Sequence, residues 1–143
     1  MPVLTWILLV EDDADHRLLV REALRRVAPD VPVEEVIDGV DAMNWLRRRV
    51  ADPALLAGGV VILDLGLPRA SGFNVLEWMR EMPSLERLPV VVLTASENPM
   101  DAEHAFNLGA RGYFQKPSDF RNYLEIFQRV FHIAEKAGEG GVR

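Results

Sequence analysis

The sequence contains no cysteine, and its apolar runs are short. Without cysteine, disulfides, thiolate zinc sites, iron–sulfur clusters and cysteine nucleophiles are excluded. The longest uninterrupted apolar run, Trp6–Val10, falls far short of the ~20 residues that span a bilayer. Residues 1–5 place no basic region before an apolar stretch, so we expect no signal peptide and no membrane partner. These absences favour a cytoplasmic protein.

Positive charge is also scarce, because 16 Lys and Arg face 22 Asp and Glu, for a net charge of -6. This balance argues against non-specific binding to nucleic acid, and we expect no nucleic-acid partner. Hydrophobic residues make up 49% of the 143 residues, which is enough for the core of one domain. We expect one domain over residues 1–137, a flexible glycine-rich tail over 138–143, and no output domain.

Short apolar runs alternate with helical patterns along the chain. The runs Ile7–Val10, Val60–Leu63 and Val90–Leu93 lack polar alternation, which is typical of strands buried on both faces. Weaker runs at Val33–Ile37 and Gly112–Phe114 predict edge strands. Apolar residues at helical spacing follow each run, over residues 19–27, 43–50, 76–82, 102–109 and 120–134. Five such repeats predict an α/β fold, a (βα)5 doubly wound parallel sheet.

Chemically active residues stand where the predicted strands end. In such sheets ligands bind beyond the carboxyl ends of the strands, so these side chains should converge. Three of them are carboxylates, which repel one another unless a cation binds, and Mg²⁺ suits carboxylate oxygens. Lys116, held extended by Pro117, adds a compact positive charge. The converging set is Glu11, Asp12, Asp64, Thr94 and Lys116.

Simpler interpretations exist for several of these positions. Asp13 or Asp15 can cap the first helix, and Thr94 alone can be a β-favouring residue at a strand end. The histidines are interpreted as surface residues, because they lie on separate predicted helices without metal-ligand spacing: His16, His104 and His132.

Four motifs together resemble the receiver domain of bacterial two-component response regulators, over roughly residues 5–136. They are Val10-Glu11-Asp12, Asp64-Leu65-Gly66-Leu67-Pro68, Thr94-Ala95 and Lys116-Pro117. The resemblance implies a flavodoxin-like receiver fold with strand order 2-1-3-4-5. It also implies that Asp64 accepts a phosphoryl group from a sensor histidine kinase. Such a protein is a phosphoacceptor rather than an enzyme, since it catalyses only its own phosphorylation and dephosphorylation.

The same resemblance assigns the remaining roles. Asp12 would ligate Mg²⁺, or Mn²⁺ in its place, with Asp64, while Glu11 would act through water and Gly66 through its backbone carbonyl. Thr94 and Lys116 would hold the phosphoryl oxygens. Thr94 and Tyr113 would form the switch that changes the protein surface, although Tyr113 taken alone is a half-buried aromatic of an edge strand.

Two departures from the usual receiver pattern concern the surroundings of Asp64. Gly66 stands where many relatives carry a polar side chain, and Ser96, two residues after Thr94, is also small. Both should leave an acyl phosphate open to water. Ser71 is expected to cap the third of the predicted helices.

The last predicted helix has apolar residues around roughly half of its circumference. A helix packed on one side of a sheet needs a narrower stripe, so Ile126, Val130 and Ile133 are expected to form a homodimer interface. Alternatively, the segment 47–59 or the tail covers them. The long second-helix connection and the aromatic last helix look similar to regulators paired with bacterial phytochromes. The run Arg47–Arg49 is either a dock for an acidic partner or a solvated helix end.

Other function classes fit less well. An aspartate-based phosphatase needs a second acid two residues after the nucleophile, where this chain has Gly66. A flavin-binding module needs a phosphate loop that Glu11, Asp12 and Asp13 would repel. An interaction module with an inactive site stays an alternative, although every expected site residue is present.

Overall fold

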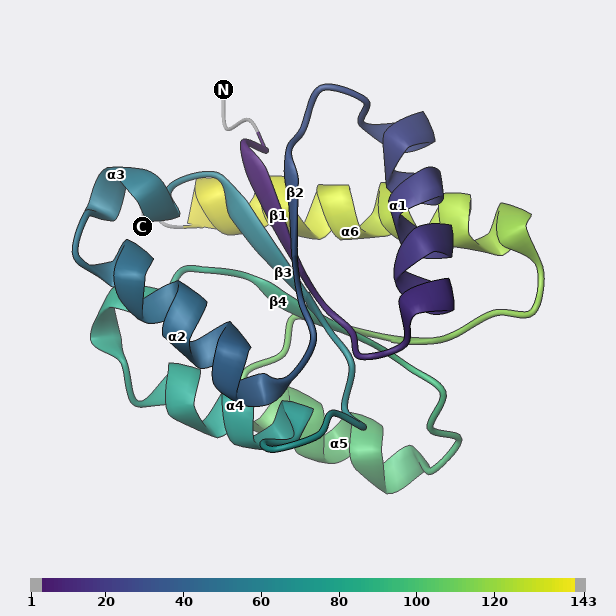
Figure 1. The fold of residues 1–143 in the computed structure, drawn as a ribbon. Helices are drawn as coiled ribbons and strands as arrows, with labels where there is room; N and C mark the ends of the chain where they lie inside the picture. The colour runs from purple at the N-terminus through teal and green to yellow at the C-terminus, as the bar shows by residue number, and fades with distance from the viewer. Residues whose placement is uncertain (1–3, 141–143) are drawn as a thin grey trace.

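The computed structural model describes residues 4–140, which form a five-stranded sheet with helices on both faces (Figure 1). All neighbouring strands are parallel, and their order β2-β1-β3-β4-β5 confirms the predicted doubly wound topology. The strands are β1 (Trp6–Val10), β2 (Val33–Val36), β3 (Gly59–Leu63), β4 (Val90–Thr94) and β5 (Gly112–Gln115).

Most of the helices begin at a polar residue that caps the first turn. Asp13 accepts hydrogen bonds from the N–H groups of Asp15 and His16, which confirms the capping interpretation. Ser71 and Asn74 form a reciprocal capping box at the start of α4, as predicted for Ser71. The helices are α1 (Ala14–Val27), α2 (Gly39–Val50), α3 (Pro53–Leu56), α4 (Gly72–Arg80), α5 (Pro99–Asn107) and α6 (Phe120–Gly140), with a 3-10 turn η1 (Pro83–Leu85).

Alternate residues of the central strands face two separate cores. Leu8 and Val10 of β1 lie in the core beneath α2, α4 and α5, whereas Ile7 and Leu9 lie in the core beneath α1 and α6 (Figure 1). Because both faces are covered, every residue of β1, β3 and β4 is buried. This double burial is the reason that these strands appear in the sequence as apolar runs without alternation.

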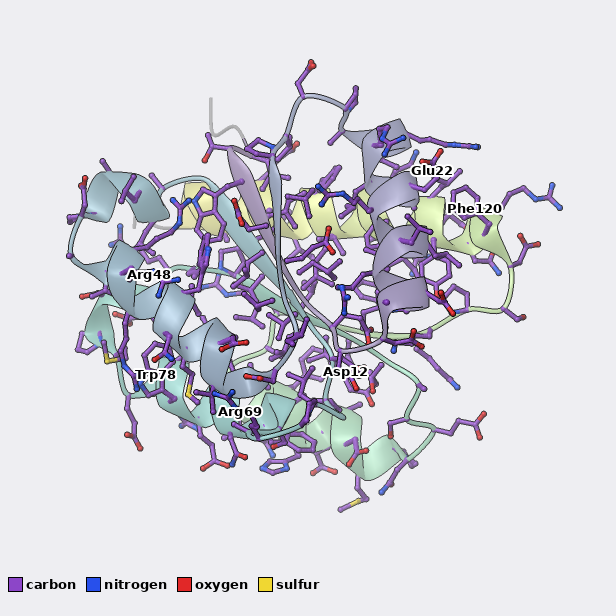
Figure 2. The ribbon with its side chains drawn as sticks, in the orientation of Figure 1. Asp12, Glu22, Arg48, Arg69, Trp78 and Phe120 are labelled. Atoms are coloured by element: carbon purple, nitrogen blue, oxygen red, sulfur yellow. The ribbon has the colours of Figure 1, made fainter. Side chains whose placement is uncertain are left out.

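The wide apolar face of α6 is largely covered within one chain. Val130 is 1% exposed and belongs to the core beneath α1 and α6, so the prediction that it lies on an exposed interface is wrong. Ile126 and Ile133 are partly buried against the same core. The face is broad because α6 contacts two neighbours, the edge strand β5 and helix α1. Figure 2 shows Phe120 beside α1, where the Arg26 guanidinium lies 5.0 Å from its ring centre.

Two of the three arginines at the end of α2 contact aromatic side chains of the same chain. The Arg49 guanidinium stacks 4.3 Å from the ring centre of Trp45, and the Arg47 guanidinium lies 5.1 Å from that of Trp78. Arg48 is exposed on the outer side of α2 (Figure 2). Arg47 is exposed as well, so the solvated-end interpretation holds for Arg47 and Arg48, whereas Arg49 is partly buried.

Helix ends differ from the sequence prediction at three places. Helix α6 continues to Gly140, so residues 138–140 are helical rather than part of a tail, while 141–143 lie outside the described residues. Helix α4 ends at Arg80, before Met82, and α5 ends at Asn107, before Gly109, whose positive φ of 104° ends the helical path. Within residues 4–140, no helix is both long and apolar enough to cross a membrane.

Candidate phosphorylation and metal site

The predicted site residues meet at one edge of the sheet, beyond the carboxyl ends of the strands. Glu11 and Asp12 follow β1, Asp64 follows β3, Thr94 ends β4, and Lys116 follows β5. Figure 2 shows Asp12 at this edge, where β1 turns towards α1. Glu11, Asp64 and Thr94 are buried, whereas Asp12 is exposed. The topology therefore places a charged, partly solvent-accessible group of side chains, here termed the pocket, where the sequence predicted their convergence.

The Lys116 ammonium lies between two of the carboxylates. Its Nζ is 2.9 Å from Glu11 Oε1 and 3.0 Å from Asp64 Oδ2. Asp64 Oδ1 faces the backbone N–H of Gly66 at 3.4 Å. The two carboxylates thus share one cation, and the buried charges are paired rather than isolated.

Backbone packing holds Asp64 in this position. Its N–H donates to the carbonyl of Val10 at 3.1 Å, which continues the pairing of β1 and β3. On its other side, Gly72 at the start of α4 presses against the Asp64 carbonyl, and a Cβ atom at position 72 would lie 2.3 Å from that oxygen. The absence of a side chain at Gly72 therefore allows α4 to pack behind the phosphoacceptor candidate.

Gly72→Ala is expected to destabilise the fold by about 3 kcal/mol, because the added methyl group meets backbone atoms that cannot rotate away. Urea denaturation measures the loss of free energy of unfolding. Gly66→Ala is the matched control, because a Cβ atom there would meet nothing within 4 Å. Equal stabilities of the two variants would contradict the packing argument.

The environment of Glu11 favours its ionised form. Burial raises the pKa of Glu11, but hydrogen bonds from His16, Lys116 and the Asp13 N–H outweigh it and lower the pKa to about 2. Burial likewise lowers the pKa of Lys116, but its hydrogen bonds to Glu11 and Asp64 raise the pKa above 10.5. Both groups are therefore charged at neutral pH.

Acid is expected to remove the stabilisation that ionised Glu11 provides. Because its folded pKa of about 2 lies below the ordinary 4.5, this contribution is complete above pH 4.5 and is lost as the pH falls towards 2. The full difference corresponds to about 3 kcal/mol. Urea denaturation between about pH 6 and pH 3 measures the part that is lost by pH 3, about 2 kcal/mol, in wild type and in Glu11→Gln, which lacks this titration. An equally steep acid loss in both proteins would contradict the expectation.

The carboxylates fit a hard divalent cation. Oxygen atoms of Glu11, Asp12 and Asp64 all lie within 4.8 Å of one another. Mg²⁺ and Mn²⁺ prefer such oxygen donors, and Mg²⁺ usually keeps several waters beside one or two carboxylates. Exposed Asp12 leaves the pocket open to a hydrated ion. The arrangement thus sets one fixed ammonium against three carboxylates, an excess of negative charge that a bound cation would balance.

Residues 7–128 match the Response regulator receiver domain. The chain belongs to the response regulator receiver domain family. The response regulator Rcp1 of Synechocystis sp. is 32% identical over 124 residues, which are 87% of this chain and 84% of Rcp1.

Solved structures of receivers share the fold. The phosphorylated cyanobacterial phytochrome response regulator RcpA aligns with a TM-score of 0.77 and 33% identity, over 88% of this chain and 90% of that one. The Mn²⁺-bound form of Rcp1 aligns with a TM-score of 0.75 and 32% identity, over 88% of this chain and 91% of that one. This chain is thus a receiver of two-component systems that is related to phytochrome response regulators.

The predicted switch residues of the receiver lie on adjacent strands, Thr94 at the end of β4 and Tyr113 near the start of β5. The Thr94 hydroxyl oxygen faces the Ser96 N–H at 3.4 Å, and its carbonyl accepts from the Lys116 N–H at 2.7 Å. Tyr113 of β5 packs against the core beneath α4 and α5, near Phe106. Its hydroxyl is buried and has no hydrogen-bond partner among residues 4–140. The Tyr113 ring is therefore held by packing and not by a polar contact.

The two departures from the usual receiver pattern leave space beside Asp64. Gly66 is exposed, and a Cβ atom there would meet nothing within 4 Å. The Ser96 hydroxyl donates to Asp101 at 2.5 Å, so that it is engaged with the start of α5. Among the described residues, the side chains at positions 66 and 96 therefore do not shield Asp64 from water.

The structure adds one residue pair that the sequence interpretation missed. His16 Nδ1 lies 2.6 Å from Glu11 Oε1, and His16 Nε2 lies 2.8 Å from the Tyr123 hydroxyl. The His16 side chain is 11% exposed, so its interpretation as a surface residue is wrong. Its place in the first turn of α1, just after a capping Asp13, is a signal that could have placed it near the end of β1.

Proposed function

We propose that this receiver accepts a phosphoryl group on Asp64 from a sensor histidine kinase in a Mg²⁺-dependent reaction. The observation that carries the proposal is the Lys116 ammonium placed 3.0 Å from Asp64 and 2.9 Å from Glu11, beside exposed Asp12. A lone structural ion pair would not require a third carboxylate within 4.8 Å. The set supplies a nucleophile, a fixed cation and the ligands of a metal at one point.

The chemistry assigns a separate role to each group. A carboxylate oxygen of Asp64 attacks phosphorus, an acyl phosphate bond forms, and the P–N bond to the donor histidine breaks with its electron pair returning to the ring nitrogen. Such transfers depend on positioning and on neutralising charge at the transferred oxygens. When bound, Mg²⁺ supplies part of that neutralisation. Asp12, Asp64 and the Gly66 carbonyl would hold it, with Glu11 acting through water.

Lys116 and Thr94 provide the remaining contacts of the phosphoryl oxygens. Lys116 can exchange its bond to Asp64 Oδ2 for a phosphoryl oxygen, because its long side chain already lies at that carboxylate. The buried Thr94 hydroxyl can donate to a second oxygen. A shift of Thr94 then changes the space available to Tyr113, so that phosphorylation alters the surface around β5.

Hydrolysis ends the phosphorylated state. Water attacks phosphorus and returns the Asp64 carboxylate and inorganic phosphate. The open space at Gly66 supports easy access of that water to an acyl phosphate. Autophosphorylation from a donor and this hydrolysis are the only reactions that we assign to the chain.

The upstream kinase is proposed to be of the phytochrome type, because the cyanobacterial phytochrome response regulator RcpA aligns with 88% of the chain. Transfer from a radiolabelled phytochrome-type kinase to this receiver, with and without EDTA, tests the proposal. Rapid Mg²⁺-dependent labelling is expected. A receiver that takes no label from any phosphorylated histidine kinase, nor from acetyl phosphate, would overturn the proposed function.

Homodimerisation through α6 stays a prediction, now narrowed to the partly buried Ile126 and Ile133. Their remaining exposure leaves a smaller apolar surface than the sequence suggested. Sedimentation equilibrium of the whole chain at tens of micromolar measures association, and Ile126→Arg with Ile133→Arg tests the face. A monomeric wild type in both the free and the phosphorylated form would contradict a dimer.

A further inference from the structure

A line of polar contacts leads from the carboxylate pocket to the last helix. Lys116 Nζ and His16 Nδ1 both contact Glu11 Oε1, at 2.9 and 2.6 Å, and the other nitrogen of His16 contacts the Tyr123 hydroxyl at 2.8 Å. Tyr123 lies in the first turns of α6, while His16 lies in the first turn of α1. One imidazole ring therefore links the residue that follows β1 to helix α6.

The direction of these hydrogen bonds follows from the charge on Glu11. An ionised carboxylate only accepts, so His16 Nδ1–H must donate to Glu11. In the neutral ring Nε2 then accepts, and the Tyr123 hydroxyl donates to it. Burial raises the pKa of Tyr123, which keeps this hydroxyl protonated. Each polar group in the line thus has a defined partner.

The far end of the line is fixed by tight packing. Tyr123 is 3% exposed and packs with Phe127, which is fully buried, in the core beneath α1 and α6. Close-packed cores transmit displacements because they contain little free volume. A movement of the Glu11 carboxylate therefore cannot be absorbed at Tyr123 without a shift of α6. Tyr113, in contrast, belongs to the core on the opposite face of the sheet.

We propose that His16 is a positioning residue that orients Glu11 in the pocket and couples the pocket to α6 through Tyr123. This inference rests on the proposed function, because it assumes that the pocket receives a metal and a phosphoryl group. It gives the receiver a second output path, which runs beneath α1 and α6 and is separate from Thr94 and Tyr113. The surface that responds is the start of α6.

NMR spectroscopy of the ¹⁵N-labelled full chain, titrated with Mg²⁺ alone, tests this coupling. The amides of Asp12 and Asp64 report on the pocket, and those of Tyr123 and Leu124 report on α6. In wild type both groups are expected to shift with the same midpoint, since one binding event moves both.

Two variants cut only the link to α6. His16→Asn places an amide nitrogen near the position of Nδ1, so it retains a donor to Glu11 but cannot reach Tyr123. Tyr123→Phe removes the hydroxyl and leaves the contact between His16 and Glu11. In both, the pocket midpoint is expected to stay within about two-fold of wild type, while the α6 shifts fall to about a third or less. His132→Asn, the same change at an exposed histidine of α6, should behave as wild type.

His16→Leu removes both contacts, so it should also weaken Mg²⁺ binding at the pocket, by roughly three-fold or more. Full-sized α6 shifts in both His16→Asn and Tyr123→Phe would overturn the coupling, as would a wild type in which only the pocket responds. Phosphorylation of Asp64 is measured separately with acetyl phosphate. Its absence beside intact Mg²⁺ shifts would overturn the proposed function and leave the coupling standing.

Discussion

Asp64→Asn is expected to abolish phosphorylation of the chain. The amide lacks the anionic oxygen that attacks phosphorus. Glu11 and Asp64 are both buried and paired with Lys116, but Glu11 is also held by His16, whereas Asp64 Oδ1 faces the Gly66 N–H at 3.4 Å. Intact-protein mass spectrometry after incubation with acetyl phosphate and Mg²⁺ should show one added phosphoryl group in wild type and none in the variant.

The matched control is Asp30→Asn, which makes the same change at an exposed carboxylate in the connection between α1 and β2. It should be phosphorylated as wild type is. A phosphoryl adduct of equal yield in Asp64→Asn would place the acceptor elsewhere, with Asp12 as the first candidate. The removal of one of three neighbouring negative charges should not destabilise the fold, so a loss of phosphorylation in this variant reports on chemistry.

Lys116→Met is expected to have the second-largest effect, on both stability and phosphorylation. The substitution keeps an unbranched apolar side chain but leaves Glu11 and Asp64 without their shared cation. Breaking a buried ion pair on one side costs about 3 kcal/mol or more. Loss of a charge that stabilises the transferred oxygens should slow phosphorylation by about 100-fold or more.

Urea denaturation in EDTA and in Mg²⁺ separates the two effects. Mg²⁺ should recover much of the stability of Lys116→Met, because a bound cation replaces the missing positive charge among the carboxylates, and the variant should gain more from Mg²⁺ than wild type does. It should not recover the phosphorylation rate. Lys136→Met, at the other lysine of the chain, is exposed on α6 and serves as the control. Equal stability of Lys116→Met and wild type in EDTA would contradict the role of the ammonium.

The core strands and the pocket were predictable because both depend on local sequence. An apolar run such as Val60–Leu63 has no polar alternate, so only a strand covered on both faces accommodates it. Asp64 directly follows that run, and parallel strands bring their carboxyl ends to one edge. The convergence of Glu11, Asp64, Thr94 and Lys116 therefore follows from the order of the elements, without knowledge of side-chain packing.

The α6 surface was not predictable in the same way. Helical periodicity shows which residues are apolar, but it does not show how many neighbours the helix has. Val130 was expected at an interface between copies because a helix against a sheet alone needs a narrow stripe. In the structure α1 packs on α6 as well, so the additional apolar residues of α6 are covered by α1 within one chain.

The sequence by itself determined the fold class, the family and the residues that meet beyond the strand ends, because each is carried by short motifs next to strand ends. Only the tertiary structure decided that His16 belongs to the pocket and that Tyr123 is its partner. These residues are 107 positions apart, and each alone is an ordinary member of a helix. Their contact exists because α1 and α6 cover the same face of the sheet, and a pairing between distant elements leaves no periodic pattern in the sequence.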